Sequence, residues 1–337
     1  MPGEDRTDPV KGSPDGRPTV AVTRSGLPGG GLDRLGARAQ LRTWHASTPP
    51  TATDLAGLVA EADGLLCLGL DRIDGSVIEA SRRLRVVATA SVGFDNLDLA
   101  ALTARHIPAS NTPGVLTETT ADLTWALILA ASRRVVEADR FVRAGEWREP
   151  QFELMVGQDV HGGTLGIVGY GAIGRAVARR SVGFGMRVVH HDNVQAEPDG
   201  VSQWVPLEEL LQTADVVSVH VTLTPETRNL IGERQLRLMK RTAVLVNAAR
   251  GLVVEHDGLV RALREGWIFA AGLDAFAIEP IPPDDPLLTF PNCVVLPHIG
   301  SASAAARARM IDIAVENVLA GLAGERLPNC INPGVYG

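Results

Sequence analysis

The sequence predicts an α/β protein with two doubly wound parallel sheets, one domain being inserted into the other. Apolar runs typical of buried strands alternate with segments of helical spacing in two series along the chain. The first series comprises "TVAVT" from Thr19, "GLLCL" from Gly64 and "RVVAT" from Arg85. The second begins at Thr164 and comprises "TLGIV", "RVVHH", "VVSVH", "AVLVN", "AAGLD" and "CVVLP". Strands that alternate with helices in this way favour parallel sheets covered on both faces.

Two helical segments flank the second series and predict where the chain passes between domains. Residues 119–143 and the alanine-rich residues 303–322 both have helical spacing. We therefore expect a discontinuous first domain, residues 18–118 and 303–337, and an inserted second domain, residues 119–302. A chain of 337 residues, of which 45% are hydrophobic, is long enough for two such cores.

Composition argues against several classes of protein. The formal net charge is −7 and no run of Lys and Arg stands out, so we expect neither a nucleic acid nor a membrane surface as partner. Apolar stretches are shorter than the roughly 20 residues of a membrane-spanning helix. The cysteines Cys67, Cys293 and Cys330 lie far apart, which favours reduced thiols, and no metal site is expected. Residues 1–17 resemble a flexible tail more than a secretory signal, so a cytoplasmic location is the default expectation.

A glycine-rich turn between a predicted strand and a predicted helix indicates a dinucleotide site. In "GYGAIG", Gly169 permits the tight turn, Gly171 lets the backbone approach a pyrophosphate, and Gly174 allows the helix to pack closely on the strand. Such glycines also occur in turns that merely connect a strand to a helix, but here a second strand and an acid follow. Asp192, after "RVVHH", can accept hydrogen bonds from the adenosine ribose. No Arg follows it to hold a 2′-phosphate, so NAD(H) should be preferred over NADP(H).

Three residues that suit carbonyl reduction follow strands of the second series. Arg250 follows "AVLVNAA", Glu279 lies in the loop after "AAGLD", and His298 follows "CVVLP". A 2-keto acid needs a cation for its carboxylate and an acid that protonates its oxygen as hydride reaches carbon. Arg offers a planar fork, His titrates near neutral pH, and a neighbouring carboxylate favours protonated His. Position alone leaves simpler interpretations open: a strand-capping arginine, a buried histidine and a loop charge.

Several longer segments occur in an order that is specific to one enzyme family. They are "LCLGLDRID", "SVGFDNLDLAA", "NTPGVLTETTADLTWALILAASRR", "TLGIVGYGAIGRA", "NAARG", "GLDAFAIEP" and "LPHIGSAS". From about Thr19 to Pro333 the chain therefore resembles the D-isomer-specific 2-hydroxyacid dehydrogenases, in their glyoxylate/hydroxypyruvate reductase and 2-ketogluconate reductase branch. The resemblance implies two Rossmann-like or flavodoxin-like domains, with an NAD-binding domain inserted into a substrate domain.

The resemblance also implies a role for each matching residue. Arg250 would bind the substrate carboxylate and keto oxygen, His298 would be the acid/base, and Glu279 would pair with His298. Backbone N–H groups would help to bind the carboxylate, and Asp274 would hold the nicotinamide carboxamide. The implied substrate-binding residues are Gly69, Val92, Gly93 and Arg250. His220, at the end of "VVSVH", would line the adenine end of the cofactor site. The expected cofactor-binding residues are Thr120, Gly169, Gly171, Ala172, Ile173, Gly174, Asp192, His220, Ala248, Asp274, His298 and Gly300.

The chain departs from the family pattern around the expected substrate pocket. Gly69 and Leu70 stand where this branch usually has Leu-Thr, and Pro150 stands where its reductases often carry a Trp that reaches a neighbouring subunit. Ala277 and Ile278 replace the usual Glu-Pro before the retained glutamate. We expect the first two changes to leave room for substrates larger than glyoxylate.

Together these features predict an NAD-dependent (R)-2-hydroxyacid dehydrogenase that reduces a small 2-keto acid such as glyoxylate or hydroxypyruvate. A homodimer is expected, because the region of Trp147 corresponds to the dimer arm of the family. The main alternative substrate is 2-ketogluconate. Phosphoglycerate dehydrogenase is disfavoured because the pocket segments lack a cluster of cations, and formate dehydrogenase because its relatives have Gln in place of Glu279. An alternative of another class is an NAD(H)-sensing corepressor, which would bind NADH without turning over a 2-keto acid.

Overall fold

The computed structural model describes residues 16–193, 197 and 199–337, so most of the expected tail, residues 1–15, lies outside the described residues. The chain divides into two compact units. The first combines the residues up to Leu116 with Ala302–Gly337, and the second is Thr117–Ser301. Each unit contains one sheet whose strands all run parallel, which confirms the predicted α/β class. No helix of the described residues is long and apolar enough to cross a membrane.

The first unit is built on a five-stranded sheet in the order β2-β1-β3-β4-β5. Its strands are β1 (Thr19–Val22), β2 (Gln40–Thr43), β3 (Gly64–Leu68), β4 (Val86–Ala90) and β5 (Ala109–Ser110). Its helices are α1 (Gly31–Gly36), α2 (Ala52–Val59), α3 (Gly75–Ala80), α4 (Leu99–Ala104) and α11 (Ala304–Ala323), followed by the 3-10 helix η4 (Pro333–Tyr336). The short strands β2 and β5 were not among the predicted strands.

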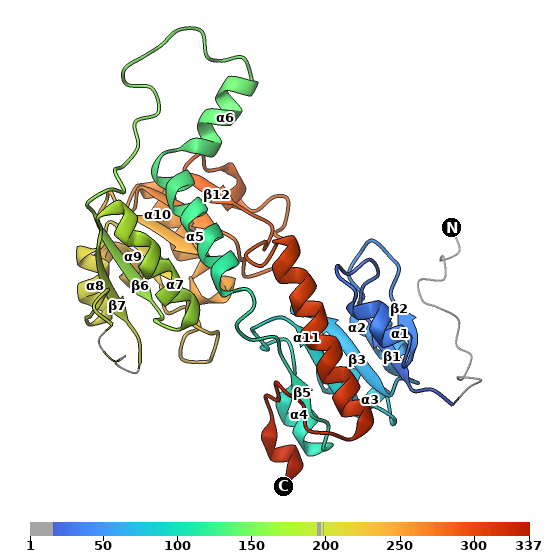
Figure 1. Ribbon diagram of the computed structural model, residues 1–337. Helices are drawn as coiled ribbons and strands as arrows, with labels where there is room; N and C mark the ends of the chain where they lie inside the picture. The colour runs from blue at the N-terminus through green and yellow to red at the C-terminus, as the bar shows by residue number, and fades with distance from the viewer. Residues whose placement is uncertain (1–15, 194–196, 198) are drawn as a thin grey trace. The chain divides into compact units, whose positions relative to one another are not determined.

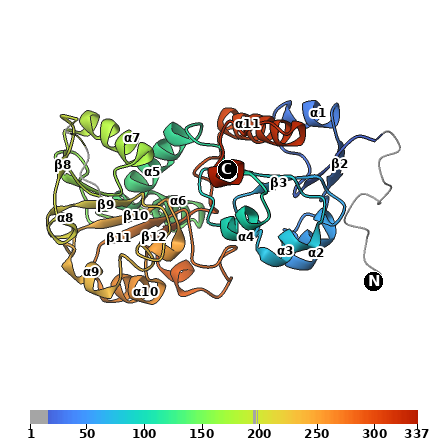
Figure 2. The same cartoon turned by 90° about the horizontal axis from the view of Figure 1, so that it is seen from below.

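Helices from both ends of the chain cover this first sheet. Figure 2 shows α1 and α11 on one side of it and α2, α3 and α4 on the other. Alternate residues of β4 face the two layers: Val86 and Ala88 pack with α1 and α11, whereas Val87 packs with the other layer. The C-terminal segment also joins the sheet edge, where Ile331 N donates to Ala109 O at 2.9 Å. Residues distant in sequence therefore share one core.

The second unit is built on a seven-stranded sheet in the order β12-β11-β10-β9-β6-β7-β8. Its strands are β6 (Thr164–Val168), β7 (Arg187–His191), β8 (Gln203–Trp204), β9 (Val216–Val219), β10 (Val244–Asn247), β11 (Ala270–Leu273) and β12 (Cys293–Val295). The order reverses between β6 and β9, because the chain adds β7 and β8 on one side of β6 before it crosses to the other. Ligands of open parallel sheets bind at the carboxyl ends of the strands beside such a reversal.

Helices cover both faces of the second sheet (Figure 1). They are α5 (Thr117–Ser132), α6 (Val135–Arg143), α7 (Ala172–Ser181), α8 (Leu207–Thr213), α9 (Glu233–Leu238) and α10 (His256–Glu265), with 3-10 helices η1 (Val182–Phe184), η2 (Gly251–Val253) and η3 (Pro286–Thr289). One core lies between the sheet and α5 and α7, and the other between the sheet and α8, α9 and α10. Trp125 belongs to the first core, and its Nε1 donates to Val177 O at 3.0 Å.

Residues 119–143, which have helical spacing, form two helices rather than one. The helix stops at Ser132, and α6 begins only after Arg134, which has φ of +54°. Ser132 O accepts a hydrogen bond from Gln158 N at 2.8 Å instead of continuing the helix. Gly157 makes this contact possible, because a Cβ there would lie 2.3 Å from Ser132 O. A tertiary contact therefore ends a segment whose spacing alone predicts a longer helix.

Two helical glycines of the first unit should respond oppositely to alanine. A Cβ on Gly321 of α11 would lie 2.5 Å from Val86 Cβ, whereas a Cβ on Gly57 of α2 meets no atom within 4 Å. Gly321→Ala should lower the free energy of unfolding by about 1–3 kcal/mol through overpacking. Gly57→Ala should raise it by about 0.5–1 kcal/mol, because alanine restricts the unfolded chain. Urea unfolding measures both, and a Gly321→Ala protein as stable as the parent would contradict the close packing of α11 on β4.

Candidate active site

Three glycines shape the turn after β6, each for a different steric reason. Gly169 has φ of +97°, and a Cβ there would lie 2.7 Å from the backbone of His220. A Cβ on Gly174 would lie 2.2 Å from Gly169 O, so only glycine lets α7 approach the turn. A Cβ on Gly171 would meet no atom within 4 Å, which leaves the backbone accessible there. The turn therefore has the steric properties that a pyrophosphate-binding turn requires.

The N-terminus of α7 fits the same ligand. Its first residues are Ala172 and Ile173, and no side chain among the described residues caps the helix at Gly171. N–H groups at an uncapped helix start point at any anion placed there, and the helix dipole attracts negative charge. These residues fit the pyrophosphate of a dinucleotide.

Asp192 lies beside this turn, directly after β7. Its Oδ2 accepts a hydrogen bond from Tyr170 N at 2.7 Å, so the carboxylate and the glycine turn are fixed to each other. A carboxylate offers about four acceptor sites, which leaves capacity for ribose hydroxyls. Arg175 of α7 lies over the ring of Tyr170, with 4.8 Å from Cζ to the ring centroid, and pairs with Asp199 at 3.7 Å. This arginine is therefore already paired with a carboxylate.

His220 follows β9, on the opposite side of β6 from Asp192. Its Nε2 lies 2.7 Å from Ser218 Oγ, and its backbone contacts Gly169. Burial lowers the pKa of His220 to about 4, so the ring is neutral at pH 7. A neutral Nε2 can accept the proton of the Ser218 hydroxyl.

Neighbouring strands carry the candidate catalytic residues to one edge of the sheet. Strands β10, β11 and β12 are adjacent and parallel, so their carboxyl ends meet at the same edge. Arg250, Asp274 and His298 each follow one of these strands, and Glu279 lies in the loop after β11. The strand order thus places these sequence-predicted residues along one edge.

The imidazole of His298 is paired with Glu279. Nδ1 of His298 lies 2.7 Å from Oε2 of Glu279, and the other oxygen, Oε1, accepts from Phe276 N at 2.8 Å. A carboxylate can only accept, so we assign the ring proton at this contact to Nδ1. Nε2 then remains for a proton exchanged with a ligand. His298 has φ of +54°, a conformation that costs a non-glycine residue about 1–2 kcal/mol.

The loop that carries Arg250 is held by two residues that the sequence analysis did not select. Asn247 Oδ1 accepts from Ala249 N at 3.0 Å, and its Nδ2 donates to Arg250 O at 2.9 Å. Gly251 packs directly on the loop that leads to Glu279, since a Cβ there would lie 1.9 Å from Phe276 C. Their position in "NAARG" was the available signal, but the sequence does not reveal which atoms they contact.

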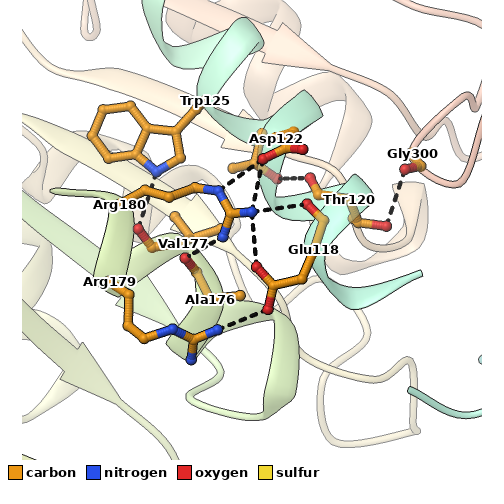
Figure 3. A network of polar contacts seen from close by, with 10 residues as sticks. Glu118, Thr120, Asp122, Trp125, Ala176, Val177, Arg179, Arg180 and Gly300 are labelled. Carbon is orange, nitrogen blue, oxygen red and sulfur yellow. Dashed lines mark hydrogen bonds and ion pairs between the residues drawn. The ribbon is translucent and has the colours of Figure 1, made fainter. Parts of the chain in front are cut away.

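Asp274 and Gly300 adjoin the same edge. The carboxylate of Asp274 accepts from Ile299 N and Gly300 N, each at 2.7 Å. Burial raises the pKa of Asp274, although both N–H groups and the charge of His298 act in the opposite direction. Thr120 Oγ1 of α5 donates to Gly300 O at 3.1 Å (Figure 3). Ala248 lies partly buried between β10 and Arg250.

The expected carboxylate-binding residues Val92 and Gly93 belong to the first unit. They lie in the loop after β4, whereas Gly69 follows the neighbouring strand β3. A Cβ on Gly69 would lie 2.8 Å from Ser91 Cβ. The side chain of Ser91 therefore occupies the space next to Gly69, and this contact does not support the expectation that Gly69 enlarges a pocket.

The same two loops are tied together within the first unit. Asn96 Nδ2 donates to Leu68 O at 3.1 Å and to Asp71 O at 3.0 Å, and Asp71 Oδ2 accepts from Leu68 N at 2.8 Å. Arg24 pairs with the buried carboxylate of Asp71 at 3.0 Å. These contacts give the loop after β3 a defined shape.

The depressed pKa of His220 predicts how stability depends on pH. Between pH 6.5 and about 4 the unfolded chain binds a proton at this residue and the folded chain does not, so the free energy of unfolding should fall as the pH falls. The contribution of His220 amounts to up to about 3 kcal/mol. His220→Gln should therefore lose less thermal stability than the parent between pH 7 and pH 4.5. The exposed His161→Gln is the matched control, and equal pH dependence of the parent and His220→Gln would contradict the assignment.

Comparisons with known proteins identify the family. Residues 125–300 match the NAD-binding domain of the D-isomer specific 2-hydroxyacid dehydrogenases. The chain is 51% identical over 321 residues to a glyoxylate reductase of Korarchaeum cryptofilum, and the match covers 94% of this chain and 96% of that relative. A solved structure of a protein from Thermus thermophilus has 48% identity and a TM-score of 0.88, and the similarity covers 93% of this chain and 99% of that one.

A second solved structure is that of a named reductase. The NADPH-dependent glyoxylate/hydroxypyruvate reductase of Sinorhizobium meliloti, in complex with NADP and malonate, has 32% identity and a TM-score of 0.84. The similarity covers 94% of this chain and 97% of that chain. Together with the edge built by Arg250, Glu279 and His298, these matches confirm the resemblance drawn from the motifs. The chain belongs to the D-isomer specific 2-hydroxyacid dehydrogenase family and is an oxidoreductase that acts on 2-hydroxy acids.

Proposed function

We propose that the protein is an NADH-dependent (R)-2-hydroxyacid dehydrogenase that works mainly as a reductase of glyoxylate or hydroxypyruvate. The observation that carries this function is the 2.7 Å contact between His298 Nδ1 and Glu279 Oε2 at the carboxyl edge of the second sheet. The relative from Korarchaeum cryptofilum, named a glyoxylate reductase, supports the substrate class. The cytoplasmic location stays a prediction from the sequence.

The proposed reaction gives each of these residues a role. Arg250 binds the substrate carboxylate and polarises the keto oxygen. Glu279 holds Nδ1 of His298 and favours the protonated ring, so that Nε2 delivers a proton to the keto oxygen. NADH, when bound, supplies the hydride that reaches the keto carbon. Carbon gains the hydride and oxygen the proton, which gives the 2-hydroxy acid.

Oxidation of NADH in the presence of candidate keto acids tests this function. The parent should reduce glyoxylate and hydroxypyruvate, whereas methyl glyoxylate, which lacks the carboxylate, should react poorly. His298→Gln should lower turnover by about a hundredfold or more with NADH binding nearly unchanged. Glu279→Gln should move the loss of reductive activity to lower pH, because the protonated ring loses its carboxylate partner.

Four outcomes would contradict it. Turnover by His298→Gln within a few-fold of the parent would mean that another group is the acid. An unchanged pH profile in Glu279→Gln would reject the pairing. Tight NADH binding without turnover of glyoxylate, hydroxypyruvate or 2-ketogluconate would favour a sensor, and efficiency confined to 2-ketogluconate would favour the other reductase of this branch.

We propose NADH as the preferred cofactor because Asp192 would repel a 2′-phosphate and Arg175 is paired with Asp199. Catalytic efficiency should be at least about tenfold higher with NADH than with NADPH, or about 1.4 kcal/mol. Asp192→Asn is the sharp variant, because an amide oxygen can still accept from Tyr170 N while the charge is removed. This variant should narrow the difference in catalytic efficiency between NADH and NADPH. Equal catalytic efficiencies with NADH and NADPH in the parent would reject the role of Asp192. The test is useful because a relative with 32% identity is NADPH-dependent.

A homodimer is proposed from the exposed apolar side chains of the arm, residues 135–156. Helix α6 has no buried residue, and α6 and the following loop extend away from the rest of the second unit (Figure 1). Phe152 is 97% exposed and Trp147 55% exposed, and Val135, Val142 and Val156 are also exposed. So many apolar side chains in one segment are typical of a contact surface, and a second copy of this chain is the proposed partner.

The matched variants Phe152→Ser and Val182→Ser test this surface. Val182 is 68% exposed on the same unit but lies outside the arm, in η1. Sedimentation velocity should show a dimer for the parent and for Val182→Ser. The Phe152→Ser dimer should dissociate at protein concentrations at least about tenfold higher than those at which the parent dimer dissociates. The substitution removes about 1.4 kcal/mol or more of apolar contact. A monomeric parent, or equal dissociation of both variants, would reject the arm as the interface.

A further inference from the structure

His298 has a backbone conformation that its neighbours must maintain. Its φ of +54° lies in the left-handed region, which residues other than glycine adopt rarely. Such a conformation persists where the surrounding structure holds it, and it is frequent at functional sites. His298 N donates to Leu296 O at 3.0 Å, which fixes the chain on the N-terminal side. The contacts of the next two residues hold the chain on the C-terminal side.

One carboxylate makes both of those contacts. Oδ1 of Asp274 accepts from Ile299 N, and Oδ2 accepts from Gly300 N, each at 2.7 Å. Hydrogen bonds from N–H groups to an ionised carboxylate are stronger than those between neutral groups. Asp274 is only 1% exposed, and its own N–H donates to Asn247 O at 2.9 Å, so the carboxylate is anchored to the sheet.

The opposite side of Gly300 is held by α5. Thr120 Oγ1 donates to Gly300 O, and a Cβ on Gly300 would lie 3.2 Å from Asp274 Oδ2 and 3.4 Å from Thr120 Cγ2. Gly300 is therefore enclosed between the two side chains. Figure 3 shows that the same turn of α5 is bound to α7, where Arg179 pairs with Glu118 at 2.8 Å and Arg180 pairs with Asp122. The segment after His298 thus contacts a helix that is itself bound to α7.

We propose that Asp274 is a positioning residue for proton transfer. By binding the N–H groups of Ile299 and Gly300, it holds His298 in the conformation in which Nδ1 reaches Glu279 and Nε2 remains for the substrate. Asp274 does not contact the ring through any of these hydrogen bonds; it acts through the backbone. This positioning role rests on the proposed acid role of His298.

The role is separate from the contact with the nicotinamide carboxamide that the family resemblance implies for the same residue. A carboxylate has about four acceptor sites, so two backbone contacts leave capacity for a third donor. The two roles predict different results. A contact with the cofactor affects NADH binding, whereas the positioning of His298 affects turnover at saturating NADH and is present before any cofactor binds.

Asp274→Asn tests the positioning role because it keeps the shape of the side chain. One carboxylate oxygen becomes an NH2 group that faces a backbone N–H, so one hydrogen bond is lost and two donors meet. We expect kcat at saturating NADH to fall by about tenfold to a hundredfold, as displacement of a catalytic group commonly causes. The matched control is Asp215→Asn, which alters a carboxylate that accepts from Thr164 N at 2.8 Å elsewhere in the unit and should leave kcat unchanged.

A double-mutant cycle distinguishes the two roles of Asp274. In the His298→Gln background, Asp274→Asn should cause little further loss of kcat, because the group that it positions is already absent. If Asp274→Asn lowers kcat equally in the parent and in the His298→Gln background, the positioning role is overturned. An effect confined to the KM for NADH would also overturn it, and would assign Asp274 to the cofactor alone.

A spectroscopic measurement keeps the result independent of the proposed activity. In the cofactor-free protein, the Nδ1–H proton shared with Glu279 should give a downfield NMR resonance, identified by its loss in His298→Gln. The resonance should be shifted or lost in Asp274→Asn and retained in Asp215→Asn. An unchanged resonance in Asp274→Asn would overturn the positioning role even if the enzyme reduces keto acids. A parent without turnover would reject the proposed function but leave this measurement decisive.

Discussion

The hydrogen bond between His298 Nδ1 and Glu279 determines what the candidate site can do. A neutral imidazole has one donor and one acceptor nitrogen, so the carboxylate decides which nitrogen faces outward. That contact exists because β11 and β12 are neighbours in a parallel sheet, which brings the loops after both strands to one edge. It also depends on Phe276, whose N–H holds the second oxygen of Glu279. The chemistry therefore depends on strand order as much as on residue type.

Close backbone contacts at glycines support this edge and the adjoining dinucleotide turn. Gly251 brings the Arg250 loop against Phe276, and Gly174 brings α7 against Gly169 O, at distances that no Cβ would allow. Both contacts place backbone where a side chain would otherwise prevent it. Interiors are packed so densely that such an approach cannot be replaced by a small shift of the neighbours. These glycines thus help to position the Arg250 loop and α7 through close backbone contacts.

The residues that the sequence singled out belong to different units. Arg250, Glu279 and His298 belong to the second unit, while Val92 and Gly93, which the family resemblance implies as carboxylate donors, belong to the first. Each set is ordered by contacts within its own unit: Asn247 and Asp274 in the second, and Asn96 in the first. Gly69 shows why a departure from a family pattern needs a structure for its interpretation, because Ser91 occupies the space that the missing side chain leaves.

The sequence by itself determined the α/β class, most strands and the residues of the glycine turn, because apolar runs and turn glycines are local signals. It also indicated Arg250, Glu279 and His298, through their positions after strands and through family motifs. The tertiary structure alone decided that the helix after residue 116 breaks at Ser132, since the bond from Gln158 N joins residues distant in sequence. It likewise decided that both oxygens of Asp274 hold the segment after His298. Such contacts depend on which loops the strand order brings together, and a local pattern does not record that arrangement.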